Sequence, residues 1–152
     1  MKFIKQDERG FTSFDNYFAY IASIKERLDE RLFAFASDPS RYDLNSKGSL
    51  HDAWIQSMQI EADHGYNGKH VDRSDISLTL LGPFHDRLHV LQYFDVKWSS
   101  INLQFGGQNR HKDLLLHELR WENGLLQHQF EFDGGGVLEF HCLNIEYQEH
   151  ML

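Results

Sequence analysis

The chain has 152 residues, with 15 Lys and Arg against 23 Asp and Glu, and its net charge is −8. Hydrophobic residues make up 41% of it and aromatic residues 14%, which is enough for a folded core and excludes disorder as the main state. No apolar run approaches the ~20 residues that a membrane-spanning helix needs, and one cysteine excludes an internal disulfide. No secretory signal is visible at the start, so we expect a single cytoplasmic domain over residues 1–152.

The negative charge is concentrated near the end of the chain. Residues 113–152 contain eight acids and one base, and therefore carry −7, whereas residues 1–112 carry −1. Nucleic acids and anionic membrane surfaces are recognised by clustered positive charge, so neither is an expected partner. Concentrated acid favours a basic protein partner, although negative charge also simply keeps a small protein soluble.

The first predicted element is an amphipathic helix over residues 13–37. Its apolar stripe consists of Phe14, Phe18, Ile21, Ile24, Leu28, Leu32 and Phe35. Thr12 and Asp15 are expected to form a weak capping box at its start. Lys25 and Asp29 are spaced to form an i,i+4 ion pair on its solvent-exposed face. The helix is expected to end at Asp38, because the residue before a proline avoids the helical conformation.

A polar connector over residues 38–50 separates this helix from a predicted sheet over residues 51–148. Alternation of apolar and polar residues places strands near 54–60, 76–80, 88–98, 114–122, 125–133 and 137–147, and residues 101–105 either extend the third of these past a bend or form another. Strands in a row without intervening helices predict an α+β fold. We expect the N-terminal helix to pack on one face of a mostly antiparallel, meandering sheet of about six strands.

The clearest local signal is a hairpin whose turn residues are Asn123 and Gly124. The register that follows pairs Trp121 with Leu126, Leu119 with His128, His117 with Phe130, and Leu115 with Phe132. After a turn at residues 134–136, the next strand is expected to pair Phe132 with Leu138, Phe130 with Phe140, and His128 with Cys142. This register also puts Glu131 opposite Glu139.

The inward face of these strands carries His117, His128 and Cys142, which are zinc-ligand types. The same face is strongly apolar, and histidines on such a face usually serve as hydrogen-bonded core residues, so no metal or cofactor is expected. A second histidine set lies in loops, with His85 and His89 spaced at i,i+4. His51, His64 and His70 belong to this set, whose scatter argues against one metal site.

The outward face of the same strands is the candidate partner-binding surface. Its candidate binding residues are Glu118, Arg120, Glu122, Gln129, Glu131, Asp133, Glu139 and His141, and Gln127 projects from the same face. Such a face can bind cations on a partner, or it can be an ordinary solvated surface. Two carboxylates can also perform acid–base catalysis in a cleft, but a flat strand pair is a poor place to shift a pKa. The sequence contains no recognisable nucleophile, phosphate-binding or zinc-protease motif.

Four segments share a pattern with known proteins: Ser49-Leu50-His51-Asp52-Ala53, Ile76–Leu80, Leu91–Val96 and Leu138–Tyr147. Over residues 49–147 the chain resembles small bacterial domains of unknown function, some of which are immunity proteins of polymorphic toxin systems. The resemblance implies stoichiometric binding and neutralisation of a cognate toxin without catalysis. It carries over no functional residue, because such families share no site motif.

Together these features predict a non-enzymatic, acidic binding protein of the immunity type that binds a basic toxin through its C-terminal sheet face. Two alternatives stay open. One is a metal-dependent protein or enzyme that uses the inward or loop histidines. The other is a homo-oligomeric structural domain.

Overall fold

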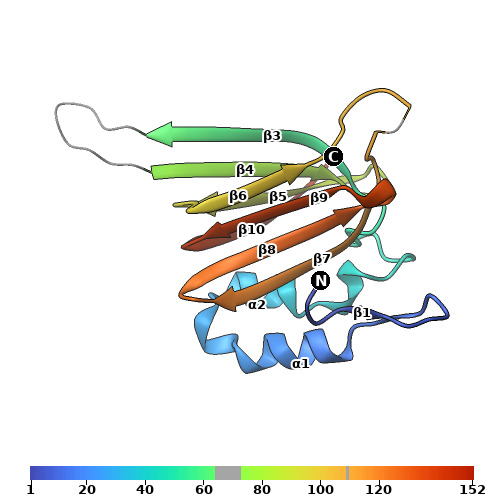
Figure 1. Ribbon diagram of the computed structural model, residues 1–152, viewed down its shortest axis with the longest axis horizontal. Helices are drawn as coiled ribbons and strands as arrows, with labels where there is room; N and C mark the ends of the chain where they lie inside the picture. Colours follow the sequence, from blue (N-terminus) through green and yellow to red (C-terminus); the bar gives the residue numbers. More distant parts are fainter. Residues whose placement is uncertain (64–72, 109) are drawn as a thin grey trace.

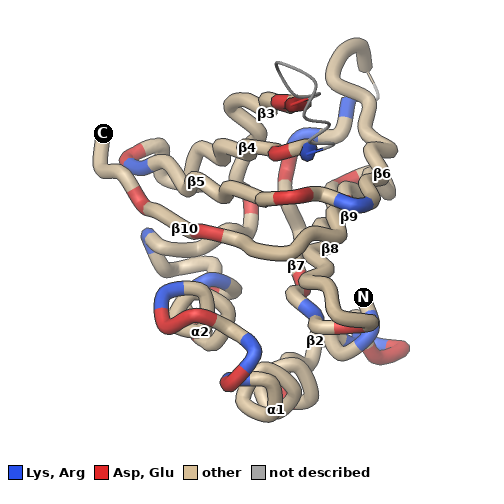
Figure 2. The backbone as a smooth tube through the Cα atoms, turned by 90° about the vertical axis from the view of Figure 1, so that its left-hand side faces the viewer, with Lys and Arg blue, Asp and Glu red and all other residues tan. Residues whose placement is uncertain are grey.

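The computed structural model describes residues 1–63, 73–108 and 110–152. In this part of the chain, two four-stranded antiparallel sheets pack together above a layer of short helices (Figures 1 and 2). The sheet that we call the β3 sheet has the order β10-β5-β4-β3, and the β7 sheet has the order β6-β9-β8-β7. The strand bounds are β3 Trp54–Asp63, β4 Arg73–Leu81, β5 Arg87–Phe94, β6 Trp98–Asn102, β7 Leu114–Glu122, β8 Leu125–Phe132, β9 Val137–Cys142 and β10 Asn144–Met151.

The prediction of one sheet of about six strands is therefore wrong, although α and antiparallel β elements are both present. The predicted strands 88–98 and 137–147 each divide between the two sheets, as β5 with β6 and as β9 with β10. The first corner contains Asp95, whose φ is +53° and whose N–H donates to the Asp75 carboxylate. Strands that change sheets at such corners let two sheets cover each other, which alternation along one strand does not reveal.

The single helix predicted over residues 13–37 is also wrong. The structure has α1 (Asp15–Ser23), the 3-10 turn η1 (Lys25–Arg27) and α2 (Glu30–Ala36). Leu28 is extended, and the Asp29 carboxylate accepts the N–H of Leu32, so Asp29 starts a new helix instead of pairing with Lys25. A side-chain cap of this kind ends one helix and begins another without interrupting the apolar stripe.

The residues just before α1 form a β-strand and do not cap the helix as predicted. Thr12 lies in β2 (Thr12–Ser13), which pairs with β1 (Lys5–Gln6), and the start of α1 has no side-chain cap. The connector after α2 contains the 3-10 turn η2 (Pro39–Arg41). No helix in the described residues is both long and apolar enough to cross a membrane.

The helices do not lie on one face of a sheet. They close one open side of the sandwich, where α1 contacts β7 and α2 contacts β10 (Figure 2). The sheets and helices enclose a core whose largest fully buried side chains are Tyr17, Phe35, Tyr93, Phe130, Phe132 and Phe140. Burial of each such side chain contributes roughly 1.5–3 kcal/mol, so this interior is the main source of stability.

The hairpin prediction is confirmed near its turn. Asn123 and Gly124 both have positive φ, and Trp121, Leu119 and His117 face their predicted partners. Farther from the turn, a bulge between Leu114 and Leu116 places Leu114 opposite Phe132, so the Leu115 pairing is wrong.

The predicted register between β8 and β9 is wrong by two residues. Phe130 pairs with Leu138, His128 with Phe140, and Leu126 with Cys142. The reason is the 3-10 turn η3 (Asp133–Gly135), which brings the Phe132 N–H onto the Gly136 carbonyl. A shift of two residues keeps every side chain on its face but changes its neighbour.

Candidate partner-binding face

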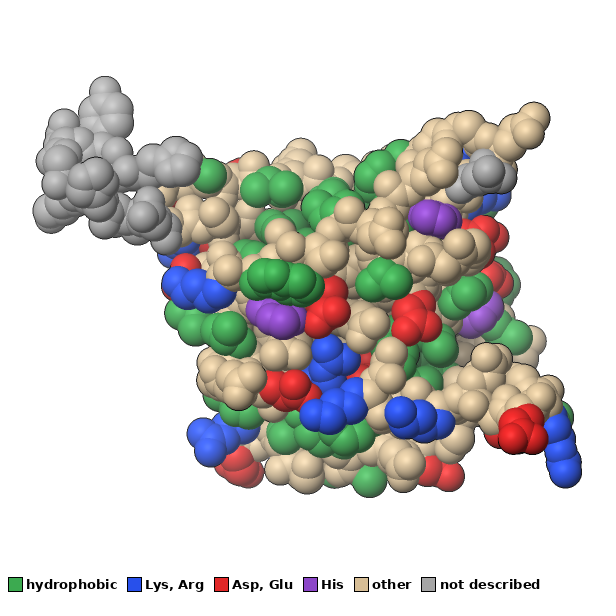
Figure 3. Space-filling model, viewed as in Figure 1, with side chains coloured by type: hydrophobic (Ala, Val, Ile, Leu, Met, Phe, Trp, Pro, Cys, Tyr) green, Lys and Arg blue, Asp and Glu red, His purple; other side chains and the backbone are tan. Residues whose placement is uncertain are grey.

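The outer face of the β7 sheet carries one connected set of polar side chains, which we call the Arg120 network. Its members are Glu118 and Arg120 on β7, Gln127 and Gln129 on β8, and Glu139 and His141 on β9. Strand alternation brings them to this face, opposite the core. Figure 3 views this face directly and shows acidic and basic side chains interleaved over these strands.

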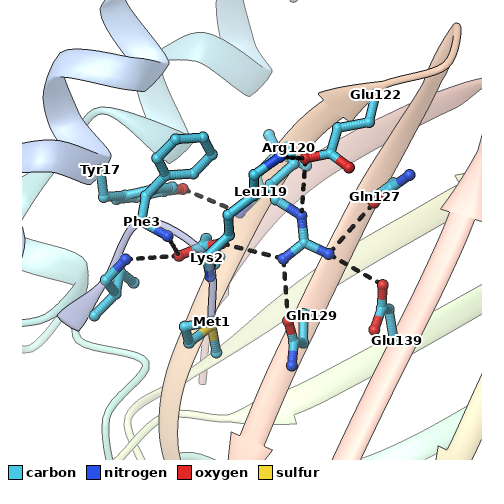
Figure 4. Close-up of polar contacts among 12 residues, drawn as sticks. Met1, Lys2, Phe3, Tyr17, Leu119, Arg120, Glu122, Gln127, Gln129 and Glu139 are labelled. Atoms are coloured by element: carbon cyan, nitrogen blue, oxygen red, sulfur yellow. Dashed lines mark hydrogen bonds and ion pairs between the residues drawn. The ribbon is translucent and has the colours of Figure 1, made fainter. Parts of the chain in front are cut away.

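Glu118 is fully buried beneath the start of the chain. Its two carboxylate oxygens accept the backbone N–H groups of Lys2, Phe3 and Ile4 at 2.7–2.8 Å (Figure 4). The Arg120 guanidinium donates to the same carboxylate at 3.1 Å. Four donors around one carboxylate offset the cost of removing its charge from water, so Glu118 fastens the N-terminal segment to the sheet.

Arg120 is the centre of the network. Besides Glu118, its guanidinium donates to Gln129 at 3.0 Å, to Gln127 at 3.3 Å and to Glu139 at 3.1 Å (Figure 4). Only 7% of the residue is exposed. This planar, many-donor group thus fixes acceptors on three strands at once.

The network leads from this buried centre to an exposed tryptophan. Glu139 Oε1 lies 2.7 Å from His141 Nε2, and the His141 ring lies 4.5 Å from the ring of Trp98 on the edge strand β6. Trp98 itself is 48% exposed. The ring of Trp98 is therefore exposed to solvent, and the hydrogen-bonded side chains of Glu139 and His141 hold it in place.

The structure brings six of the eight predicted site residues together around the Arg120 guanidinium, namely Glu118, Arg120, Glu122, Gln129, Glu139 and His141. Glu122 lies 3.9 Å from Arg120 and also pairs with Lys2. The other two take different partners, and Glu131 lies 2.9 Å from the Met1 amino group. Asp133 lies apart from the network, and its carboxylate accepts the N–H groups of residues 112 and 113.

The predicted juxtaposition of Glu131 and Glu139 does not occur. Glu131 faces Val137, and Glu139 faces Gln129. The carboxylates of this face are partly neutralised by Arg120, Lys2 and the Met1 amino group, so it is less negative than residue counting suggests.

Carboxylate oxygens on this face can still accept hydrogen bonds from another molecule. Both contacts of Glu139 use Oε1, and among the described residues its Oε2 has no hydrogen-bond partner. The side chains of Glu139, Glu122 and Glu131 are 18%, 30% and 36% exposed. These oxygens remain accessible to cationic groups of another molecule.

Sequence reasoning missed Trp98 and Lys2. Alternation placed Trp98 at the end of one long strand, whereas it begins β6 after the corner at residues 95–97. The only local signal for that corner is the Asp95-Val96-Lys97 interruption of the strand pattern. Nothing near Lys2 in the sequence indicates that it lies beside Glu122, 120 residues away.

The inward histidines lie in the core. His117 Nδ1 is 3.1 Å from His128 Nε2, and His128 Nδ1 is 2.9 Å from the Tyr93 hydroxyl. His117 stacks on Phe35 and Tyr42. Burial lowers the pKa of His117 to about 3 and that of His128 well below 6.5, so both rings are neutral near pH 7.

Cys142 does not join these histidines in a metal site. It faces Leu126, and its sulfur lies 3.8 Å from the Leu126 carbonyl oxygen. Burial raises the pKa of its thiol to about 12, so it stays protonated. In the described part of the chain, no group of three or more His, Cys, Asp or Glu side chains could hold a metal ion.

The loop histidines are separated in the same way. His85 adopts a positive φ and packs 4.7 Å from Trp54, whereas His89 points inward and lies 2.8 Å from the Tyr147 hydroxyl. His51 lies 3.0 Å from the Asp52 carboxylate. His64 and His70 lie outside the described residues.

The chain was compared with protein families, curated proteins and solved structures. No protein-family model, no curated protein and no solved structure matches this chain.

Proposed function

We propose that this chain is a non-enzymatic binding protein whose partner, a basic protein, docks on the outer face of the β7 sheet. The observation that carries the proposal is the exposed Trp98 held above the Arg120 network. Binding energy at protein interfaces is concentrated in a few aromatic and arginine side chains that are positioned before the partner arrives.

The line of contacts from Glu118 to Trp98 supports this role. Glu118 and Arg120 are buried, Glu139 is held by Arg120, and His141 is held by Glu139 and supports the tryptophan ring. Because these positions are fixed in the free protein, little side-chain entropy is lost when Trp98 is covered.

Charge supports a basic partner. The chain carries −8 overall, and Glu139, Glu131 and Glu122 leave partly exposed carboxylates around the network. Since cations of the chain itself already neutralise much of this face, we expect these carboxylates to orient the partner and Trp98 to supply most of the affinity.

The resemblance to toxin immunity proteins suggests the first partner to test, which is the product of a gene beside this one. We expect it to bind this chain with one-to-one stoichiometry and to lose its toxicity when the two are produced together. Trp98→Ala is expected to weaken binding about 30-fold, the effect of losing an interface anchor worth about 2 kcal/mol, as measured by calorimetry.

The matched control is Trp54→Ala, which removes an aromatic side chain from an edge strand of the other sheet. It is expected to leave the affinity unchanged. Equal weakening by both substitutions, or full affinity in Trp98→Ala, would contradict the proposed face. Failure of both flanking gene products to bind would count against the immunity function.

A further inference from the structure

The four edges of the two sheets are protected to different degrees. On β7, the hydroxyl of Tyr17 accepts the N–H of Leu119, the hydroxyl of Tyr20 bonds both the N–H and the carbonyl of Trp121, and the Tyr42 hydroxyl donates to the His117 carbonyl. Side chains thus close this edge.

Two other edges carry features that discourage pairing. The β3 strand has a bulge between Ile55 and Ser57 and the charged residues Glu61 and Asp63 toward its end. The β10 strand is packed against α2 and also carries acids. Bulges, charges and covering elements are ways in which proteins prevent unwanted strand addition.

The β6 edge lacks all of these features. Its sequence Trp-Ser-Ser-Ile-Asn has no charge and no proline, and its pairing with β9 has no bulge. Among the described residues, its backbone makes no hydrogen bond on the side away from β9. Four of its five residues are exposed.

From this contrast we propose that β6 receives an extended, basic segment of the partner as an additional antiparallel or parallel strand. The proposal rests on the function proposed above and specifies how the partner is held. An added strand completes the free backbone bonds of β6, while its side chains alternate between the two faces of the sheet.

The side chains around β6 indicate the chemistry of that segment. On the outer face, the small Ser100 lies directly opposite Glu139, whose Oε2 has no partner in the described part of the chain. An Arg or Lys placed beside Ser100 can reach across it to this carboxylate. On the inner face, Ile101 is 40% exposed and offers an apolar contact. The expected segment therefore alternates basic and apolar residues.

Charge favours such a segment over a second copy of this chain. Two molecules that each carry −8 repel each other, whereas a basic segment is attracted. A two-fold pairing of β6 with itself is the competing arrangement, and the experiment below separates the two.

The probe is a short, blocked synthetic peptide that alternates Arg and Val, added to the full-length chain. Amide spectra and hydrogen exchange are expected to show saturable binding, with exchange at residues 98–102 slowed about tenfold or more. A peptide that alternates Arg and Gly has the same charge but poor strand propensity, and is expected to bind about tenfold more weakly.

Ser100→Arg tests the site without removing a core side chain. The new cation occupies Glu139 and repels the peptide, so affinity is expected to fall about tenfold. Ser57→Arg makes the same change on the β3 edge and is expected to have no effect. If the two peptides bind equally, or if the two variants have equal effects, charge attraction alone explains the binding. Either result would overturn the proposed strand addition.

Sedimentation equilibrium without peptide completes the test. A dimer in which the β6 amides are already protected would assign the edge to a second copy and overturn the proposal. If a flanking gene product binds through Trp98 while the β6 amides exchange freely, strand addition fails and the proposed function stands.

Discussion

Glu118 shows how much a single side chain depends on distant parts of the chain. Strand alternation correctly assigns it to the outer face of the β7 sheet, where an exposed carboxylate is the natural expectation. Its full burial results from residues 2–4, which lie more than 110 positions away in the sequence. No local pattern predicts such a contact, so the surface role inferred for Glu118 could not be distinguished from a structural one.

We expect Glu118→Gln to destabilise the fold by about 3–5 kcal/mol, the usual cost of breaking a buried ion pair. The amide would turn a donor toward the N–H groups of residues 2–4 and leave Arg120 with less compensating charge. Urea unfolding at pH 7 measures the loss.

Glu122→Gln is the control, because Glu122 is partly exposed and pairs with Lys2, with a longer 3.9 Å contact to Arg120, and ion pairs at the surface contribute about 0–1 kcal/mol. Similar losses in the two variants would show that the burial of Glu118 has little energetic consequence.

At the scale of elements, the sequence predicted what is local. The Asn123-Gly124 turn fixed the β7–β8 register near the turn, because positive φ at both residues determines the hairpin geometry. The β9 register failed because the glycine-rich turn uses residues 133–135 instead of 134–136, and a turn moved by one residue shifts every pair by two. The corners between β5 and β6 and between β9 and β10 failed because each side of a corner alternates like one continuous strand.

The tyrosines that close the β7 edge lead to a second prediction. Tyr20→Phe removes the hydroxyl that bonds the Trp121 N–H and carbonyl, and we expect a loss of about 1–2 kcal/mol together with faster hydrogen exchange at the Trp121 amide. Tyr17→Phe should instead release the Leu119 amide. Each variant is the control for the other, and accelerated exchange at the same amides in both would refute a specific edge-closing role.

At the scale of the whole molecule, both sheets contribute histidines to one interior. His89 comes from β5 in the β3 sheet, and His117 and His128 come from β7 and β8 in the β7 sheet. Periodicity correctly placed His117 and His128 on an apolar face, but it assigned His89 to a loop, and His89 is in fact buried in β5. It could not show that two sheets, rather than one, bury them, and this double burial is what lowers their pKa values and keeps them neutral.

This interior makes stability depend on pH. Burial, with a smaller contribution from the Arg41 charge, lowers the pKa of His117 from 6.5 to about 3 and that of His89 to about 4. The unfolded chain therefore binds protons below pH 6.5 that the folded chain excludes until pH 4 or lower. Stability is full above pH 6.5 and falls as the pH decreases toward the folded-state pKa values.

By pH 5, each of these histidines is expected to have cost about 2 kcal/mol of stability, and His128 acts in the same direction. A domain of this size has only about 5–15 kcal/mol in total, so the protein should be close to unfolding by pH 4–5. Acidification also reduces the net charge of −8, which on its own would stabilise the fold, so this general charge effect does not explain a loss over this range.

His89→Phe keeps an aromatic ring beside Tyr147 and removes one titrating group. Whatever it costs at pH 7, the difference in unfolding free energy between pH 7 and pH 5 should shrink by about 2 kcal/mol relative to the unsubstituted chain, as measured by urea unfolding at constant ionic strength. His150→Gln removes an exposed histidine and should leave that difference unchanged. An unchanged difference in His89→Phe would mean that the acid sensitivity of the fold arises elsewhere. The carboxylates held by Arg41 and Arg87 are then the next groups to test. Burial opposes ionisation of Glu149, but its bonds to Arg41 and Tyr147 outweigh burial and lower its pKa.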